Sequence, residues 1–142
     1  MTNNRVVSRF GAALLLFCLA ASAYAHHGIV GWFDMSRSIS VKGTVTSFEW
    51  TNPHSYISCD VKDEQGAITK WNAEMGGVPM LGRAGWRRET VKPGDQITLM
   101  GRPAKDGKHS MLLDKVVLAN GKELPATDVP LPPAEGDKTP KE

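Results

Sequence analysis

The strictest pattern in the chain is the alternation of apolar and polar side chains from residue 54 to residue 63. Ile57, Cys59 and Val61 fall on one side of this run, and polar side chains occupy the positions between them. A period of two residues is typical of a β-strand that buries one face and exposes the other. A second run of this kind, over residues 67–75, follows after a short polar turn, so a β-hairpin is expected here.

Three further strands and one helix complete the predicted order. The strands are expected over residues 41–50, 96–103 and 111–119, and a helix of two turns over 78–84. The alternation in the first strand changes phase at Thr46, which predicts a β-bulge. Five strands with a helix between the third and the fourth predict a mainly β fold, a small OB-like Greek-key barrel. A two-sheet sandwich is the alternative.

The first 25 residues have the three parts of a secretory signal peptide. Two arginines and no acidic residue precede an apolar run over residues 10–21, and the small residues Ala23 and Ala25 follow it. Cleavage is expected after Ala25, which predicts a secreted protein of the periplasm. The apolar run has 12 residues, whereas a membrane span needs about 20, so no stable membrane anchor is expected.

Cleavage would leave three regions. These are an N-terminal segment over 26–40, the OB-like barrel over 41–124 and a disordered tail over 125–142, which has five prolines and no apolar periodicity. Cys59 would be the single remaining cysteine, so the hydrophobic core has to hold the fold without an internal disulfide. Its place in an alternating apolar face predicts that Cys59 is buried rather than reactive.

The charge balance argues against a nucleic-acid partner. The chain has 17 Lys and Arg against 15 Asp and Glu, and removal of Arg5 and Arg9 with the signal peptide leaves 15 against 15. Binding to a polyanion needs an excess of basic groups. The acidic residues are spread over separate predicted elements, and no pair of them suggests an acid–base dyad, so a non-catalytic protein is expected.

Aromatic and polar residues between the first two predicted strands indicate a binding surface. Trp50, Asn52, His54 and Tyr56 are its candidate residues. Such a patch suits a sugar, a peptide or another exported protein, so the expected partner is a small ligand or an exported protein. The alternative is that the tryptophans fill the core and that Asn52 forms a turn with Pro53.

The expected mature N-terminus offers a metal site. Its α-amine and the ring of His26 can chelate one ion, and nitrogen ligands of this kind favour copper as Cu(II). Neighbouring residues of an extended chain point to opposite sides, so His27 joins His26 on one ion only where the chain turns. His54 is the candidate third ligand, and His109 lies in the other loop that OB folds use for binding. The alternatives are a flexible N-terminal pair and a His54 that hydrogen-bonds the backbone.

Several short motifs resemble those of one protein family. The most specific is Glu-Trp-Thr-Asn-Pro-His over residues 49–54. The others are Ala-His-His-Gly at 25–28, Phe-Asp at 33–34, Gly-Thr-Val at 43–45, Gly-Trp at 85–86, Pro-Gly-Asp at 93–95 and Ala-Lys-Asp-Gly at 104–107. Together they resemble a family of small secreted bacterial proteins classed as a domain of unknown function, over about residues 25–121. The resemblance implies secretion and a β-rich domain, and it implies no reaction.

Overall fold

The computed structural model of the protein describes residues 31–128. The signal peptide, the cleavage after Ala25, His26, His27 and the chain beyond residue 128 lie outside the described residues. The contacts within the chain define a compact unit that begins at Phe33 and contains the sheet. Between residues 31 and 128, no helix is long and apolar enough to cross a bilayer.

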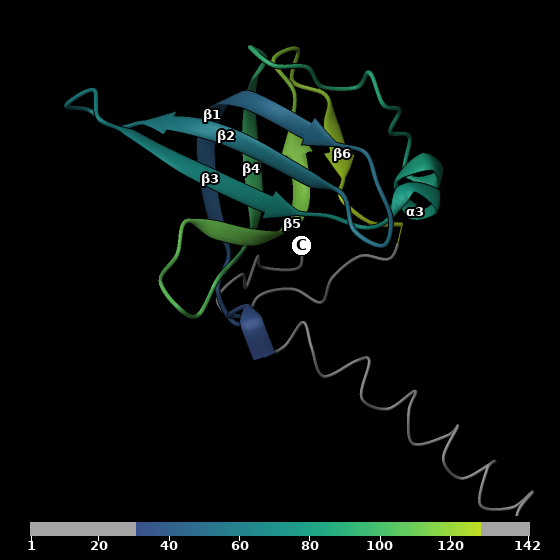
Figure 1. Cartoon of the computed structure of the whole chain (residues 1–142), viewed down its shortest axis with the longest axis horizontal. Coiled ribbons are helices and arrows are strands. Elements are labelled where there is room, and N and C mark those ends of the chain that lie inside the picture. The colour runs from purple at the N-terminus through teal and green to yellow at the C-terminus, as the bar shows by residue number, and fades with distance from the viewer. Residues whose placement is uncertain (1–30, 129–142) are drawn as a thin grey trace, which may run out of the picture. The chain divides into compact units, whose positions relative to one another are not determined.

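The described part of this unit contains six strands and one short helix, which Figure 1 shows as arrows and as a coiled ribbon. They are β1 (Ile39–Glu49), β2 (Tyr56–Lys62), β3 (Ile68–Glu74), α3 (Val78–Arg83), β4 (Gln96–Pro103), β5 (Ser110–Val117) and β6 (Glu123–Pro125). The five expected strands and the helix between the third and the fourth are confirmed. The short strand β6 was not expected.

The first five strands close into a barrel. β1 pairs with both β2 and β4, β2 pairs with β3, and β4 pairs with β5, all antiparallel. A short parallel pairing of β3 with β5 completes the ring. This connectivity confirms the predicted OB-like barrel, and the two-sheet sandwich is wrong.

Two breaks in register bend the strands of the barrel. The pairing of β1 with β2 shifts between Val45 and Ser47, where the sequence predicts a bulge. The pairing of β4 with β5 shifts between Met100 and Gly101. A Cβ atom at residue 101 would lie 2.2 Å from the backbone oxygen of Leu112, so the close approach of the two strands requires glycine there.

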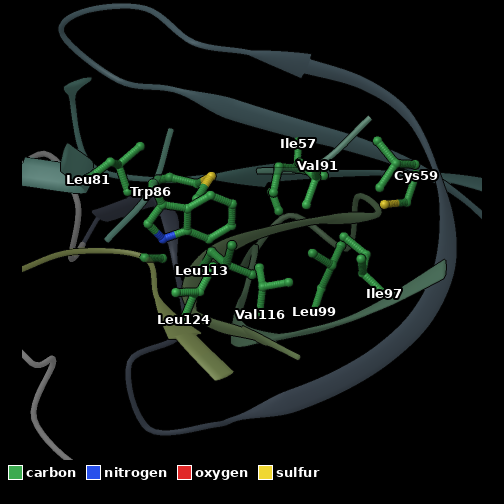
Figure 2. Packing of buried hydrophobic residues seen from close by; sticks show 14 of the residues in the cluster. Ile57, Cys59, Leu81, Trp86, Val91, Ile97, Leu99, Leu113, Val116 and Leu124 are labelled. Carbon is green, nitrogen blue, oxygen red and sulfur yellow. The ribbon is translucent and has the colours of Figure 1, made fainter. Parts of the chain in front are cut away.

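Apolar side chains fill the interior of the barrel (Figure 2). Trp86 is fully buried, and its ring lies 5.7 Å from the ring of Phe48. Ile57 and Cys59 are buried as their alternation predicts. Burial and the nearby charge of Asp60 raise the pKa of Cys59 to about 11, which keeps this thiol protonated and unreactive at neutral pH.

The residues before β1 are fastened to the end of β4. Phe33 is buried and forms an isolated antiparallel bridge with Ala104. The backbone N–H of Asp34 donates to the carbonyl of Pro103 at 2.8 Å. The folded unit therefore begins before residue 41, where the barrel domain was expected to start.

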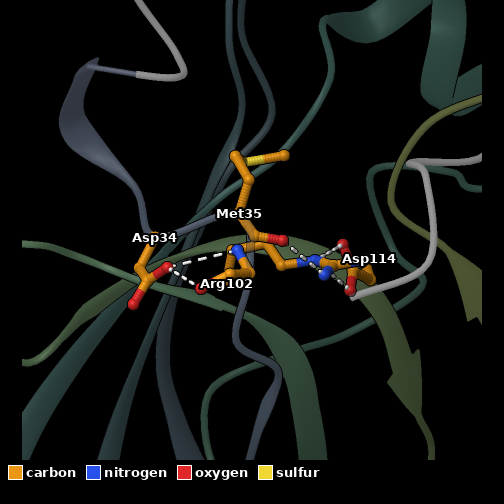
Figure 3. A network of polar contacts seen from close by, with 5 residues as sticks. Asp34, Met35, Arg102 and Asp114 are labelled. Atoms are coloured by element: carbon orange, nitrogen blue, oxygen red, sulfur yellow. Dashed lines mark hydrogen bonds and ion pairs between the residues drawn. The ribbon is translucent and has the colours of Figure 1, made fainter. Parts of the chain in front are cut away.

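A buried arginine holds this N-terminal segment to the barrel (Figure 3). Arg102 of β4 is 3% exposed, and its Nη1 donates to the carbonyl of Met35 at 3.0 Å. Its Nε lies 3.1 Å from Oδ2 of Asp114 on β5. Burial raises the pKa of Asp114, and the charge and hydrogen bond of Arg102 offset only part of that effect.

The end of β6 and the residues that follow it also belong to the folded unit. The indole Nε1 of Trp86 donates to the carbonyl of Pro125 at 2.7 Å. Ala126 is buried, and its N–H donates to the carbonyl of Asp114 at 2.9 Å. Asp128 pairs with Arg83 of α3. The predicted start of the tail at residue 125 is therefore too early, because the backbone of these residues satisfies Trp86 and extends the sheet.

Candidate binding site

His54 and Glu74 form a side-chain pair that joins the β1–β2 loop to β3. The imidazole Nδ1 of His54 contacts Oε1 of Glu74, and the two side chains are 40% and 22% exposed. The pair therefore lies at the surface of the barrel and not in its core. A contact at Nδ1 orients the imidazole and leaves Nε2 for another partner.

Tyr56 lies between two carboxylates. It stands opposite Glu49 in the pairing with β1 and opposite Glu74 in the pairing with β3. Burial raises the pKa of Tyr56, and the negative charges of Glu74 and Glu49 raise it further. The phenol therefore stays protonated at physiological pH, and its O–H group can donate a hydrogen bond.

Trp50 connects this surface to the core. Its ring meets the ring of Phe48 edge-on, with the centroids 5.6 Å apart and the planes at 68°. Phe48 in turn contacts the buried Trp86. Trp50 is partly buried against the core cluster. It therefore fills part of the core, as the alternative interpretation of the tryptophans expects, and the rest of the residue remains exposed beside the loop.

Asn52 fixes the β1–β2 loop against the start of α3. Its Oδ1 accepts a hydrogen bond from the backbone N–H of Val78 at 2.9 Å. A Cβ atom at Gly77 would lie 2.8 Å from this Oδ1 and 2.6 Å from the carbonyl oxygen of Pro53, so the loop and the helix start are in close contact. The Asn52 side chain therefore positions the loop that carries His54.

A serine inside the same loop adds to its rigidity. Ser55 is fully buried, and its Oγ donates to the carbonyl of Thr51 at 3.0 Å. Its backbone carbonyl accepts a hydrogen bond from the N–H of Met75 at 2.9 Å. Residues on either side of His54 are thus held by hydrogen bonds, and the imidazole is presented from a fixed backbone.

The outward face of β2 and β3 continues this surface with polar side chains. The amide Nδ2 of Asn72 donates to Oγ of Ser58 at 3.2 Å. Asp60 and Lys70 stand opposite each other one pair further along. We define the His54 surface as Glu49, His54, Tyr56 and Glu74 at the loop end of the sheet, together with Trp50 at its rim, whose ring packs on Phe48.

The described histidines have separate partners. The ring of His109 lies 5.3 Å from the ring of Trp71, whereas His54 pairs with a carboxylate. Between residues 31 and 128, no group of three or more His, Cys, Asp or Glu side chains is placed to hold a metal ion. A copper site made by His26, His27 and His54 therefore has one ligand within the described residues and two outside them.

A shallow hollow of about 200 Å³ lies elsewhere on the barrel. Thr90, Gln96, Ile97 and Leu118 are among the residues that line it. Pockets for small ligands usually enclose about 300–1,000 Å³, so this hollow is small for such a ligand. Because core side chains fill the barrel, the His54 surface remains the better candidate for ligand binding.

The comparisons with known proteins come from sequence and structure. The model of a family of unknown function, DUF6152, matches residues 13–113 of the chain. Comparison with curated protein sequences found no match. Among solved structures, the mitochondrial single-stranded DNA binding protein Rim1 from S. cerevisiae is similar, with 16% sequence identity and a TM-score of 0.41. That match covers 58% of this chain and 92% of the other chain.

Proposed function

The chain belongs to DUF6152, a family of unknown function, and we propose that it is an exported, non-catalytic binding module of the periplasm. Because the family has no assigned role, the proposal rests on the residues of this chain. The proposed contact region is the His54 surface. The observation that carries the proposal is the surface pair of His54 and Glu74 beside Tyr56. Three hydrogen-bonding side chains of different character thus stand together where the β1–β2 loop meets the sheet.

The chemistry of this surface favours a ligand rich in hydrogen-bond donors. The carboxylates of Glu49 and Glu74 accept hydrogen bonds, and the phenol of Tyr56 donates one. Trp50 adds an aromatic ring at the rim, on which a sugar ring or a cationic group can stack. A peptide with basic side chains or a sugar matches this set of groups. Neither ligand requires an excess of basic residues, which the chain lacks after the expected export.

Nuclear magnetic resonance titration tests this proposal with two probes of defined chemistry, a tetralysine peptide and a maltooligosaccharide. We expect at least one probe to shift the amide signals of residues 54, 56 and 74. The variants His54→Ala and Tyr56→Phe should weaken that response, and the control Lys122→Ala, in the turn before β6, should leave it unchanged. Shifts centred on other elements, or no response to either probe, would contradict the proposal.

Copper binding is the second candidate function, and the orientation of His54 favours it. Histidines that bind metals commonly engage a carboxylate through one ring nitrogen, which fixes the ring and leaves the other nitrogen for the ion. Glu74 supplies such a carboxylate at Nδ1. Cleavage after Ala25 would add the α-amine and the ring of His26 as Cu(II) ligands.

Titration of the exported protein with Cu(II) tests the second candidate, after mass spectrometry has established that the chain starts at His26. Binding should weaken in His54→Ala and when one extra residue precedes His26, because each change removes a ligand. His109→Ala is the matched control, since its ring contacts Trp71. Unchanged binding in both test variants would exclude the shared site.

A further inference from the structure

The residues after β6 reach the His54 loop through hydrogen bonds of the backbone. Ala126 is fully buried, and its N–H donates to the carbonyl of Asp114 on β5 at 2.9 Å. The carbonyl of Ala126 accepts a hydrogen bond from the N–H of Gly76 at 3.0 Å. Ala126 therefore joins β5 to the segment that follows β3, and both of its backbone groups are used.

Gly76 continues this connection to the loop. Its carbonyl accepts a hydrogen bond from the N–H of Ser55 at 3.3 Å, and the carbonyl of Ser55 accepts one from the N–H of Met75 at 2.9 Å. Ser55 directly follows His54, and Met75 directly follows Glu74. The backbone on which the His54–Glu74 pair is built thus depends on the position of Gly76.

A second connection runs through α3. We define the C-terminal strap as residues 125–128, which are the last residue of β6 and the three residues after it. The Nε of Arg83, at the end of α3, donates to Oδ2 of Asp128 at 2.6 Å. At the start of this helix, the N–H of Val78 donates to Oδ1 of Asn52. The helix therefore links the C-terminal strap to the β1–β2 loop.

The His54–Glu74 pair needs such support because it lies at the surface. Both side chains are partly exposed, and an exposed charged pair contributes little free energy of its own. The pair therefore does not fix the loop by itself. A backbone that is already ordered reduces the entropy that the two side chains lose when they form their contact. The geometry of the pair thus follows the backbone beneath it.

We propose that Ala126 is a positioning residue of the His54 surface and that the C-terminal strap controls this surface. The docked strap holds His54 against Glu74, and release of the strap loosens the pair. This inference deepens the proposed function and rests on it for the ligand alone. Coupling between two sites is reciprocal, so a ligand that requires the ordered pair also stabilises the docked strap. Any partner that draws the strap away from β5 would weaken binding at the His54 surface.

Two variants release the C-terminal strap in different ways. Ala126→Pro removes the N–H that donates to Asp114 and puts a ring in its place. Asp128→Lys replaces the attraction to Arg83 with repulsion, at an exposed position. Glu89→Lys is the matched control, because it makes the same change of charge at an exposed residue outside the strap.

The tautomer of His54, measured by 15N nuclear magnetic resonance of its ring, tests the positioning role without any ligand. A neutral ring that donates to Glu74 carries its proton on Nδ1, whereas a free histidine prefers Nε2. At a pH of about 8.5, where a free imidazole is uncharged, the wild type and Glu89→Lys should hold the Nδ1–H form. The ratio of the Nδ1–H form to the Nε2–H form should fall about tenfold in Ala126→Pro.

Asp128→Lys weakens one anchor only, so the same ratio should fall at least about twofold. This variant decides alone if Ala126→Pro does not fold. Urea denaturation establishes that each protein is folded under the conditions of the measurement, and in a folded protein a mere loss of stability leaves the tautomer unchanged. A wild-type ratio in the folded strap variants, or an equal fall in Glu89→Lys, would overturn the proposal.

A binding measurement then tests whether the C-terminal strap controls the surface. The tetralysine peptide or the maltooligosaccharide, whichever binds the wild type, should bind Ala126→Pro about tenfold more weakly and Asp128→Lys at least about twofold more weakly. Glu89→Lys should bind like the wild type. Equal affinities in all four proteins would overturn control by the strap. If neither probe binds the wild type, the proposed function fails, whereas the tautomer still decides the positioning role.

Discussion

The Nδ1 of His54 contacts Oε1 of Glu74, and this contact ties the β1–β2 loop to the last residue of β3. The loop is also held from its other side, where Asn52 accepts a hydrogen bond from Val78. A histidine between two such attachments has a fixed backbone and a ring that is oriented by its neighbour. Both candidate functions depend on this arrangement.

The first prediction concerns the carboxylate behind His54. Glu74→Gln keeps the size of the side chain but removes its charge, so the imidazole loses the partner that orients it. If copper binds at His54, the affinity for Cu(II) should fall about tenfold or more. Competition with a chelator of known affinity measures the change. Glu123→Gln, which affects the exposed pair with Lys115, is the control, and equal affinities for the wild type and both variants would contradict the role of Glu74.

The second prediction concerns the buried arginine of β4. Arg102→Met leaves the half-buried Asp114 without its cation and the carbonyl of Met35 without this donor. Breaking a buried pair from one side typically costs about 3–5 kcal/mol of unfolding free energy. Lys115→Met removes an exposed pair and should cost less than about 1 kcal/mol. Urea denaturation measures the free energy of unfolding of both variants. Similar losses in the two variants would show that burial of the Arg102–Asp114 pair does not increase the cost of breaking it.

The third prediction concerns pH. Burial raises the pKa of Asp114 above the ordinary value of an aspartate, so the folded state holds this proton more tightly than the unfolded state does. The resulting contribution to stability is complete below the unfolded pKa and is lost as pH rises through the folded pKa. The wild type should therefore lose stability relative to Asp114→Asn as pH rises from about 4, measured as the difference between their free energies of unfolding. A difference that does not vary with pH would contradict the raised pKa.

The fourth prediction concerns two glycines with opposite surroundings. Gly101→Ala places a Cβ atom against the backbone of Leu112, and overpacking of this kind typically costs about 1–3 kcal/mol. Gly82 lies within α3, with open space where its Cβ atom would be. Gly82→Ala should therefore stabilise the protein by up to about 1 kcal/mol. Thermal unfolding should move the two midpoints in opposite directions, and a shift in the same direction would refute the packing argument.

The strands could be predicted because their signals are local. The alternation at Ile57 and Cys59 and the change of phase at Thr46 each depend on neighbouring residues, and both the strands and the bulge are confirmed. The pairing of Glu49 with Tyr56 depends on how the bulge shifts the register of β1, which single-strand patterns do not show. That carboxylate was therefore missed as a neighbour of Tyr56.

Other features were missed because their partners are distant in sequence. Arg102 lies in a strand where a charged residue suggests exposure, and its burial depends on Met35 and Asp114. The prolines after residue 124 indicate a tail, yet Pro125 offers a carbonyl to Trp86 and closes the sheet. In both cases a polar or turn-forming residue is ordered by a group that only the folded chain brings near.

Site-specific photo-cross-linking in the producing cell tests most directly the claim that the His54 surface contacts a ligand or partner. A photoreactive amino acid at Thr51, an exposed residue of the same loop, should form a defined adduct on irradiation. The same group at Lys122, exposed in the turn before β6, should not form it, and His54→Ala should reduce it. An adduct of equal yield at both positions, or none at Thr51, would contradict the account.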